Sequence, residues 1–442
     1  TGGLETNPYR VTGGNMGATF VNDVDRDGAG NEAAPGYNRL WLSEYLEVAD
    51  ILAGYDKYPA ADLYEHPKFR KMFSYLYPML LSQKFTANVG DAASTGNPSI
   101  VIEKSQMIRA FEKYGDPIFA QLAYFRNNST AGIHSDIFTR DPEKIAADIE
   151  AVIAEYGPLK LGSTNMTGYG LAVLRDGDKP VDDFGIRYPF LALPIAEQTA
   201  ETTVLDLNGA LEFLATKPGD AVTIAFDVVE TGEYEVLLTP FRSIGSGGYG
   251  IYAMELDGQF VRTVDFYGSK SDRESVGLFH LTAGTHTVRF VCIGKHDLSA
   301  GYKMGLFELT LLDEAARLER AAALGPDTQR DVWMYYGRTS GHGHRDALNL
   351  GIVAFGLDLA PDLGYPETTL SSDTHRLEWV RNTIAHNTVV VDKMMQQPQW
   401  VGEPKQFDDR RFVKVMDVEA PKAYPHIDLY KRTVAMIRVD SE

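Results

Sequence analysis

The chain has 442 residues, of which 44% are hydrophobic and 23% charged, a composition typical of folded protein rather than of disordered, collagen-like or coiled-coil chains. Its net charge of −19 argues against a nucleic-acid partner, and no apolar run approaches the roughly 20 residues that span a bilayer. The single cysteine, Cys292, excludes an internal disulfide, so any zinc site has to use His, Asp and Glu.

The first part of the chain predicts helices. Between residues 38 and 160, apolar residues recur three and four positions apart, which indicates an all-helical zone. The expected helices cover residues 39–52, 68–81, 100–125 and 142–156. Asp116-Pro117 is expected to divide the third helix, and Asp141 precedes a proline suited to the first helical position of the fourth.

The pattern changes to β-strand from Gly168 onwards. Residues 196–314 predict a self-contained β-sandwich, with strands near 221–228, 234–238, 249–256 and 287–293 separated by Gly-bearing turns. Gly232 to Val236 and Ala283 to Val288 resemble parts of jelly-roll carbohydrate-binding modules; the alternative is a purely structural sandwich. A short helix at 313–323 and a strand at 331–336 follow.

Polar and titratable residues gather in residues 333–400. His342 and His344 are two positions apart, so on an extended strand both would face one side, next to two small glycines. Asp362 and His386 follow further along. Two imidazoles and a carboxylate form a set suited to zinc, held for structure or to polarise a substrate. The alternative is that these histidines are hydrogen-bonded in a wet groove.

These residues resemble the heparinase II/III-like polysaccharide lyases. The resemblance lies in Tyr336-Gly337, in residues 341–349, in Asp362-Leu363-Gly364-Tyr365 and in residues 382–392. A further match, residues 27–38, looks like the family's segment that ends in the catalytic tyrosine. Residues 1–195 and 315–442 are covered. The family's members cleave glycosaminoglycans, alginate and other uronate polymers, so the resemblance does not select a substrate.

The resemblance implies an α+β multidomain fold, in which an (α/α) toroid is followed by an antiparallel β-sandwich. We expect residues 1–165 to form the C-terminal part of the toroid. Residues 166–195 and 315–442 would form the lyase sandwich, truncated at its end. Residues 196–314 would be an inserted carbohydrate-binding-like jelly-roll sandwich. The implied active site lies between toroid and lyase sandwich.

The implied reaction is a β-elimination on a uronate-containing acidic polysaccharide, most readily a glycosaminoglycan-like polymer. Such a lyase removes the C5 proton of a uronate and expels the 4-linked oxygen. Tyr37 matches the family's acid, and in some geometries also a base; the alternative is a tyrosine packed at a helix start. His342 matches the family's histidine as base or as donor to the substrate carboxylate; the alternative is a supporting role behind the groove.

Substrate binding is assigned to four charged residues, although some of the arginines could be ordinary surface charges and Glu32 could simply begin a helix. They are Glu32, Arg338, Arg345 and Arg381.

The resemblance also implies a metal, zinc or another divalent cation, held by His344, Asp362 and His386. Asp346 and Asn387 are natural hydrogen-bond partners for the imidazole nitrogens of such ligands, with Asp346 equally suited to a solvated turn.

One part of the family pattern is missing. The Asn or His that neutralises the uronate carboxylate has no match before Tyr37, so we expect it on a missing N-terminal toroid part or on a second chain, with a homodimer as one possibility. The family points to a secreted protein of the periplasm or the extracellular space. The main alternative function is a non-catalytic glycan-binding surface protein on a lyase scaffold. A hydrolase would need two acids at a defined separation, and no such pair stands out.

Overall fold

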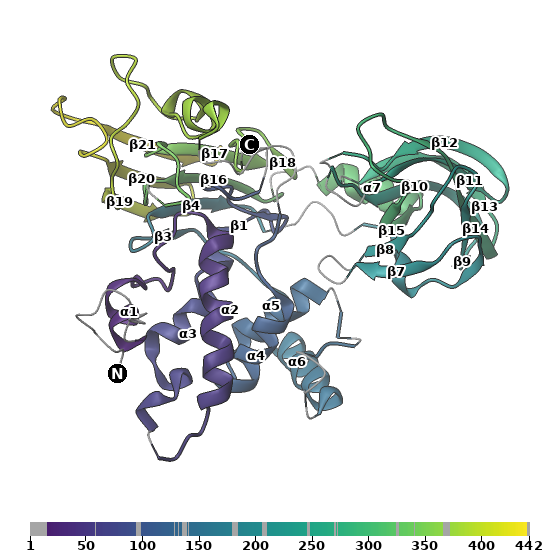
Figure 1. Cartoon of the computed structure of the whole chain (residues 1–442), viewed down its shortest axis with the longest axis horizontal. Helices are drawn as coiled ribbons and strands as arrows, with labels where there is room; N and C mark the ends of the chain where they lie inside the picture. Colours follow the sequence, from purple (N-terminus) through teal and green to yellow (C-terminus); the bar gives the residue numbers. More distant parts are fainter. Residues whose placement is uncertain are drawn as a thin grey trace. The chain divides into compact units, whose positions relative to one another are not determined.

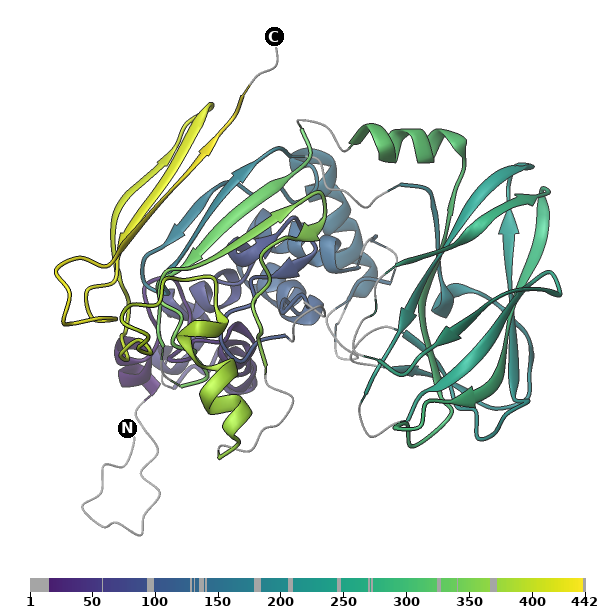
Figure 2. The same cartoon turned by 90° about the horizontal axis from the view of Figure 1, so that it is seen from above.

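The computed structural model describes residues 16–57, 59–93, 99–127, 129–130, 132–134, 139, 141–178, 184–205, 210–244, 248–268, 271, 273–323, 327–339, 341–365 and 372–439. The chain forms two compact units (Figures 1 and 2). The first unit comprises residues 1–180 and 326–442, and the second comprises residues 181–325. Within the described residues, no helix combines the length and the apolar character needed to cross a bilayer.

The helices of the first unit have the bounds α1 Met16–Asn22, α2 Pro35–Leu52, α3 Pro67–Ser74, α4 Lys104–Tyr114, α5 Pro117–Asn127 and α6 Pro142–Tyr156. Those from α2 to α6 follow the predicted order, whereas α1 was not predicted. Asp116-Pro117 separates α4 from α5, as predicted. The side chain of Asp141 accepts a hydrogen bond from the backbone N–H of Lys144 at 3.0 Å, which confirms the predicted cap of α6.

The expectation of an all-helical zone is wrong in one place. The helix predicted at 68–81 ends at Ser74, and the chain passes through a 3-10 turn, Tyr77–Met79, into a two-strand hairpin formed by β1 (Leu80–Leu81) and β2 (Phe85–Thr86). Pro78 has no backbone N–H and disfavours helical backbone in the residue before it. The apolar run after it is therefore buried as a strand.

The main sheet of the first unit lies between the helices and a second sheet. Its strand order is β18-β17-β16-β4-β3, with bounds Leu357–Asp358, Asn349–Ala354, Arg330–Tyr335, Leu171–Asp176 and Thr164–Met166. Alternate residues of a strand face opposite sides. Leu171 and Val173 of β4 accordingly join the helical core, whereas Ala172 and Leu174 face the second sheet.

The second sheet of the first unit runs β19-β20-β21, with bounds Glu403–Asp409, Val413–Glu419 and Lys431–Ile437. Met416 and Val418 of β20 pack in one core with the outward side chains of β4 and β16, including Met334. The predicted antiparallel sandwich after the helices is thus present, with helices covering one face of its main sheet (Figure 1). The arrangement of the helices as part of a toroid stays a prediction.

The second unit is a β-sandwich of two antiparallel sheets around one core. One sheet runs β13-β10-β15-β8-β7 with β5 also beside β15, and the bounds are Glu274–Leu281, Gly232–Phe241, Met304–Leu312, Ala210–Phe213, Thr202–Leu205 and, for β5, Ile186–Pro189. The other runs β12-β11-β14-β9-β6, with bounds Gln259–Asp265, Gly250–Leu256, Gly284–Lys295, Ala221–Val228 and Ile195–Gln198. Strand β9 has the predicted bounds.

The second unit extends beyond residues 196–314 at both ends. Strand β5 pairs with β15 through Tyr188 opposite Leu309, and β6 pairs with β9. The helix α7, Glu314–Ala323, contacts β10 and β15. Residues on either side of the predicted boundary therefore complete the sheets of the sandwich, because edge pairing and the covering helix lie outside the Gly-punctuated strands that the sequence pattern marks.

Candidate active site and metal group

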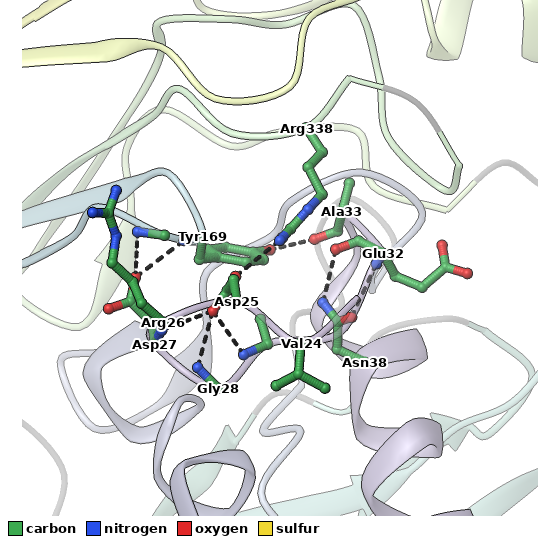
Figure 3. Close-up of polar contacts among 12 residues, drawn as sticks. Val24, Asp25, Arg26, Asp27, Gly28, Glu32, Ala33, Asn38, Tyr169 and Arg338 are labelled. Atoms are coloured by element: carbon green, nitrogen blue, oxygen red, sulfur yellow. Dashed lines mark hydrogen bonds and ion pairs between the residues drawn. The ribbon is translucent and has the colours of Figure 1, made fainter. Parts of the chain in front are cut away.

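A loop before α2 is fixed by the carboxylate of Asp25. One of its oxygens, Oδ1, accepts hydrogen bonds from the backbone N–H groups of Asp27, Gly28 and Ala29 at 2.8, 2.9 and 3.1 Å (Figure 3). The other, Oδ2, accepts one from the guanidinium of Arg338 at 2.9 Å. The two segments that resemble the lyases, 27–38 and 336–349, are thereby joined by a buried ion pair, since the Arg338 side chain is 1% exposed.

The same loop is held at further points. Asp27 Oδ2 accepts from the backbone N–H groups of Gly168 and Tyr169 at 2.6 and 3.0 Å, and Asn38 exchanges two hydrogen bonds with the backbone of Glu32 (Figure 3). These contacts fix the backbone of Glu32 while its carboxylate stays available, with 22% of the side chain exposed.

Glu32 binds His342. The imidazole Nδ1 of His342 lies 2.8 Å from Glu32 Oε2, and its backbone N–H lies 3.4 Å from the same oxygen. A carboxylate only accepts, so Nδ1 carries the proton and Nε2 is the nitrogen with a free lone pair. Gly341, between strands β16 and β17, has a φ of +69°, and a Cβ there would lie 3.0 Å from Glu32 Oε2.

The expectation that His342 and His344 share one face of an extended strand is wrong. Both lie in the loop between β16 and β17, where the backbone bends at Gly341. His342 binds Glu32 with 34% of its side chain exposed, whereas His344 is fully buried and binds Asp91 instead. The two imidazoles therefore serve different places.

Tyr37, in the first turns of α2, stacks on His342. Their ring centroids are 3.5 Å apart and their planes differ by 5°. The phenol oxygen of Tyr37 lies 3.1 Å from that of Tyr365. The structure thus brings Tyr37, His342 and Glu32 together. Because the rings lie face to face, both can act on one substrate only through their edges.

The surroundings of Tyr37 keep its phenol neutral. Burial, the hydrogen bond with Tyr365 and the nearby Asp91 raise the pKa of Tyr37 to about 12, although Arg376 opposes this effect. The Tyr37 phenol therefore carries its proton at neutral pH, which is the form that the predicted acid role needs.

The predicted metal residues also come together. Atoms of His344, Asp362 and His386 that can bind a metal lie within 4.8 Å of one another, and all three residues are buried. We call these three residues the metal group. His386 Nδ1 lies 2.7 Å from Asp362 Oδ2, and the rings of the two histidines are 5.2 Å apart.

Neighbouring side chains orient the metal group. His344 Nε2 donates to Asp91 Oδ1 at 3.0 Å, and Asp91 Oδ2 accepts from Arg376 at 2.5 Å. Asn349 donates to Asp362 Oδ2 at 2.7 Å. A carboxylate or amide that fixes a ligand's orientation in this way is typical of protein metal sites.

The charges within the metal group stabilise each other. Burial alone would raise the pKa of Asp362, but His386, His344 and the backbone N–H of Gly364 together lower it. In the same way, burial disfavours charge on His386, while Asp362 raises the pKa of its imidazole to about 9.

A divalent cation fits this group. His344 Nδ1 is buried and has no hydrogen-bond partner among the described residues, while its other nitrogen is already turned to Asp91. Two imidazoles and a carboxylate are ligands that zinc prefers. The unpaired Nδ1 of His344 is therefore available to bind a cation.

The predicted arginines occupy different environments. Arg338 is buried between Asp25 and the ring of Trp400, which lies 4.7 Å from the guanidinium. Arg345 is partly buried and donates to the Thr339 carbonyl at 3.1 Å. Arg381 is partly exposed. Arg338 thus holds the loop of Glu32 and is not displayed at a surface.

Sequence reasoning missed two partners. Asp91 touches both candidate sites, because its backbone N–H donates to the His342 carbonyl at 2.8 Å and its side chain holds His344. Tyr365 was noticed only as part of a motif, and its contact with Tyr37 was not expected. The one local signal for Asp91 is the preceding residue, Gly90. Its φ is +58°, and its backbone lies so close to the His342 carbonyl that a Cβ would not fit.

A cavity of about 950 Å³ lies elsewhere in the first unit, lined by residues such as Arg70 of α3, Tyr114 of α4 and Tyr64 of the 3-10 turn before α3. Of the described residues that line it, none belongs to the predicted site.

A segment in the C-terminal part of the first unit matches a known protein family. Residues 334–420 match the family described as heparinase II/III-like, C-terminal, which confirms the predicted resemblance over this segment. It contains His342, the metal group and strand β17. No curated protein matches the chain.

Solved structures give partial matches. A xanthan lyase of Paenibacillus is 24% identical and has a TM-score of 0.27, over 31% of this chain and 14% of that one. A GH26-CBM35 β-(1,4)-mannanase of Podospora anserina is 18% identical, with a TM-score of 0.23, over 30% and 28%. A family 35 carbohydrate-binding module from Clostridium thermocellum is 13% identical, with a TM-score of 0.22, over 29% and 98%. The chain therefore spans less than a third of the first two proteins.

Proposed function

We propose, since residues 334–420 form a heparinase II/III-like C-terminal domain, that the protein is a polysaccharide lyase that cleaves a uronate-containing acidic polysaccharide by β-elimination. The observation that carries the proposal is the contact of Tyr37 with His342, since the acid and the base of such a reaction come from segments 305 positions apart in the chain yet stack at 3.5 Å.

In this mechanism His342 takes the C5 proton at Nε2. Glu32 accepts a hydrogen bond from the Nδ1–H group, which orients the ring and stabilises the positive charge that His342 acquires. Tyr37 donates its phenol proton to the 4-linked oxygen as the bond to C4 breaks. The hydrogen bond with Tyr365 positions the phenol for this step.

The three predicted substrate-binding arginines are assigned to different tasks. Arg345 and Arg381 are partly exposed and are proposed to attract the acidic polymer. Arg338 is buried and is proposed to act indirectly, by binding Asp25 and so holding the loop that carries Glu32.

The metal group is proposed to hold zinc or another divalent cation through His344, Asp362 and His386. When bound, the cation supplies positive charge that fixes these ligands in place. Asp91 contacts both His344 and His342, and Tyr365, three residues after Asp362, contacts Tyr37. A bound cation would therefore help to hold His342 and Tyr37 in position.

The remaining parts of the molecule receive supporting roles. We propose that the helices of the first unit are part of a toroid and that the second unit binds glycan. Because a polysaccharide substrate lies outside the cell, an extracellular or periplasmic location follows. The alternative function is glycan binding without catalysis, which would use the second unit and leave the stacked pair idle.

The test mixes the protein with a panel of glycosaminoglycans, alginate and other uronate polymers. Cleavage should produce unsaturated uronates, which absorb at about 232 nm. Tyr37→Phe removes the acid but keeps the ring stack, so turnover should fall roughly 100-fold or more while glycan binding persists. Tyr45→Phe, on the same helix, is the control and should retain turnover. Binding without absorbance on every polymer would favour the alternative, and near-normal turnover by Tyr37→Phe would remove Tyr37 from the mechanism.

A further inference from the structure

Asp346 is an unpaired carboxylate in the interior of the first unit. It is 0% exposed, and neither of its oxygens has a hydrogen-bond partner among the described residues. Burying a charge without a partner is strongly unfavourable. The chain pairs its other deeply buried carboxylates, since Asp331 lies beside Arg175 and Asp25 binds Arg338. An ionised Asp346 would therefore require a positive charge that the described side chains do not provide by direct contact.

Asp346 lies next to the metal group in the chain, since it follows His344 by two positions. The charged side chains with the largest effect on it are His386, Asp362 and His344. Its backbone carbonyl accepts a hydrogen bond from the N–H of Asn349 at 2.9 Å, and the side chain of Asn349 donates to Asp362. One turn thus carries Asp346 and also orients a metal ligand.

The charge balance of the metal group also favours a second carboxylate. Two neutral imidazoles and one carboxylate leave a divalent cation with one excess positive charge in a buried place. A second carboxylate nearby makes the assembly neutral, which is the favourable state in a medium of low polarity. Asp346 lies outside the 4.8 Å group, so it does not act as a direct ligand in the observed arrangement.

We propose that Asp346 is the second carboxylate of the metal site: it would balance the charge of a divalent cation held by the metal group without being one of its direct ligands. This inference rests on the metal site of the proposed function and is independent of lyase activity. It also explains why the earlier expectation of Asp346 as a hydrogen-bond partner of imidazole fails, since its oxygens contact neither ring.

The test compares Asp346→Asn with the control Asp358→Asn. Asp358 is a half-buried carboxylate whose charge also acts on the surroundings of Asp362. Each purified protein is stripped with chelator, its affinity for Zn²⁺ is measured by competition with a chromogenic chelator, and its melting temperature is recorded with chelator and with Zn²⁺.

Asp346→Asn should bind Zn²⁺ roughly 10–100-fold more weakly than the natural protein, as for other residues that support metal ligands. Without metal it should melt no lower than the natural protein, because the carboxyl group that it replaces makes no hydrogen bond among the described residues. Asp358→Asn should keep the affinity. Should Asp346→Asn fail to fold, Asp346→Ser, which leaves room for water, is measured instead with the same expectations.

Natural affinity in Asp346→Asn would overturn the inference, as would an equal loss of melting temperature with and without Zn²⁺, which is the mark of a purely structural residue. If the natural protein binds Zn²⁺ but the variants do not differ, the metal group stands and only the role of Asp346 falls. If it binds no divalent cation, the metal site itself is wrong, and the inference falls with it. The lyase proposal is tested separately by turnover.

Discussion

Replacing Arg338 with methionine tests whether a buried ion pair holds the loop that carries Glu32. The Arg338 side chain is 1% exposed and that of Asp25 is 9% exposed, so the pair is largely shielded from water. Methionine fills much of the same volume but cannot donate to Asp25. The substitution therefore removes the charge and leaves the packing nearly intact.

The expected loss is about 3–5 kcal/mol, the usual cost of removing one partner of a buried pair. A value near the lower end is favoured because three backbone N–H groups still hold Asp25 Oδ1. The lost contact with the Trp400 ring adds about 0.5–1 kcal/mol. Lysine at position 338 keeps the charge and should cost less.

Tryptophan fluorescence during urea unfolding measures this loss in the first unit alone, because the four tryptophans, Trp41, Trp333, Trp379 and Trp400, all belong to it. Far-ultraviolet circular dichroism follows both units. The second unit has its own core, so its transition should not move.

A double-mutant cycle gives the refuting result. If Asp25 and Arg338 depend on each other, adding Asp25→Asn to Arg338→Met should cost much less than Asp25→Asn costs alone. Simple addition of the two losses, or an unchanged fluorescence transition in Arg338→Met, would show that the pair does not hold the loop.

Three further outcomes are expected. Glu32→Gln keeps a hydrogen-bond acceptor but removes the charge that orients His342, so kcat/KM on a cleaved polymer should fall roughly 100-fold with glycan binding kept, and unchanged kinetics would contradict this role. The raised pKa of Tyr37 means that its neutral form favours the folded state, so this contribution to stability is complete below about pH 10 and is lost as the pH rises towards about 12. Tyrosinate absorbance of the natural protein minus that of Tyr37→Phe should show this late titration, and a difference centred near the ordinary tyrosine pKa would refute it. Chelator should lower the melting temperature reported by tryptophan fluorescence and spare the second unit; equal shifts in both would speak against a metal in the first.

Local patterns in the sequence were sufficient for much of the secondary structure. The bounds of α6 follow from Asp141, Pro142 and Gly157, which act through neighbouring backbone groups. The break at Asp116-Pro117 and the strand β9 follow from equally short-range rules. The failure at residues 75–81 has a matching reason, since a proline in an apolar run leaves helix and strand close in energy and burial decides between them.

For the candidate site as well, local sequence indicated some features and packing decided the others. The residue types and their spacing in the motifs identified His344, Asp362 and His386 as a possible metal set, and the structure places them within 4.8 Å. The two-residue spacing wrongly placed His342 and His344 on one face of a strand, because it does not reveal the bend at Gly341, whose backbone lies against Glu32.

The sequence by itself thus determined most of the helices and strands and supplied the candidate residues for acid, base and metal-binding roles, since these follow from residue type and near neighbours. Only the tertiary structure decided that Glu32 holds His342 across 310 positions, that Asp91 serves both sites, and that Arg338 lies inside while Asp346 lacks a partner. Such pairings depend on how distant segments pack, and packing is set by the sum of many weak contacts that no short stretch of sequence contains.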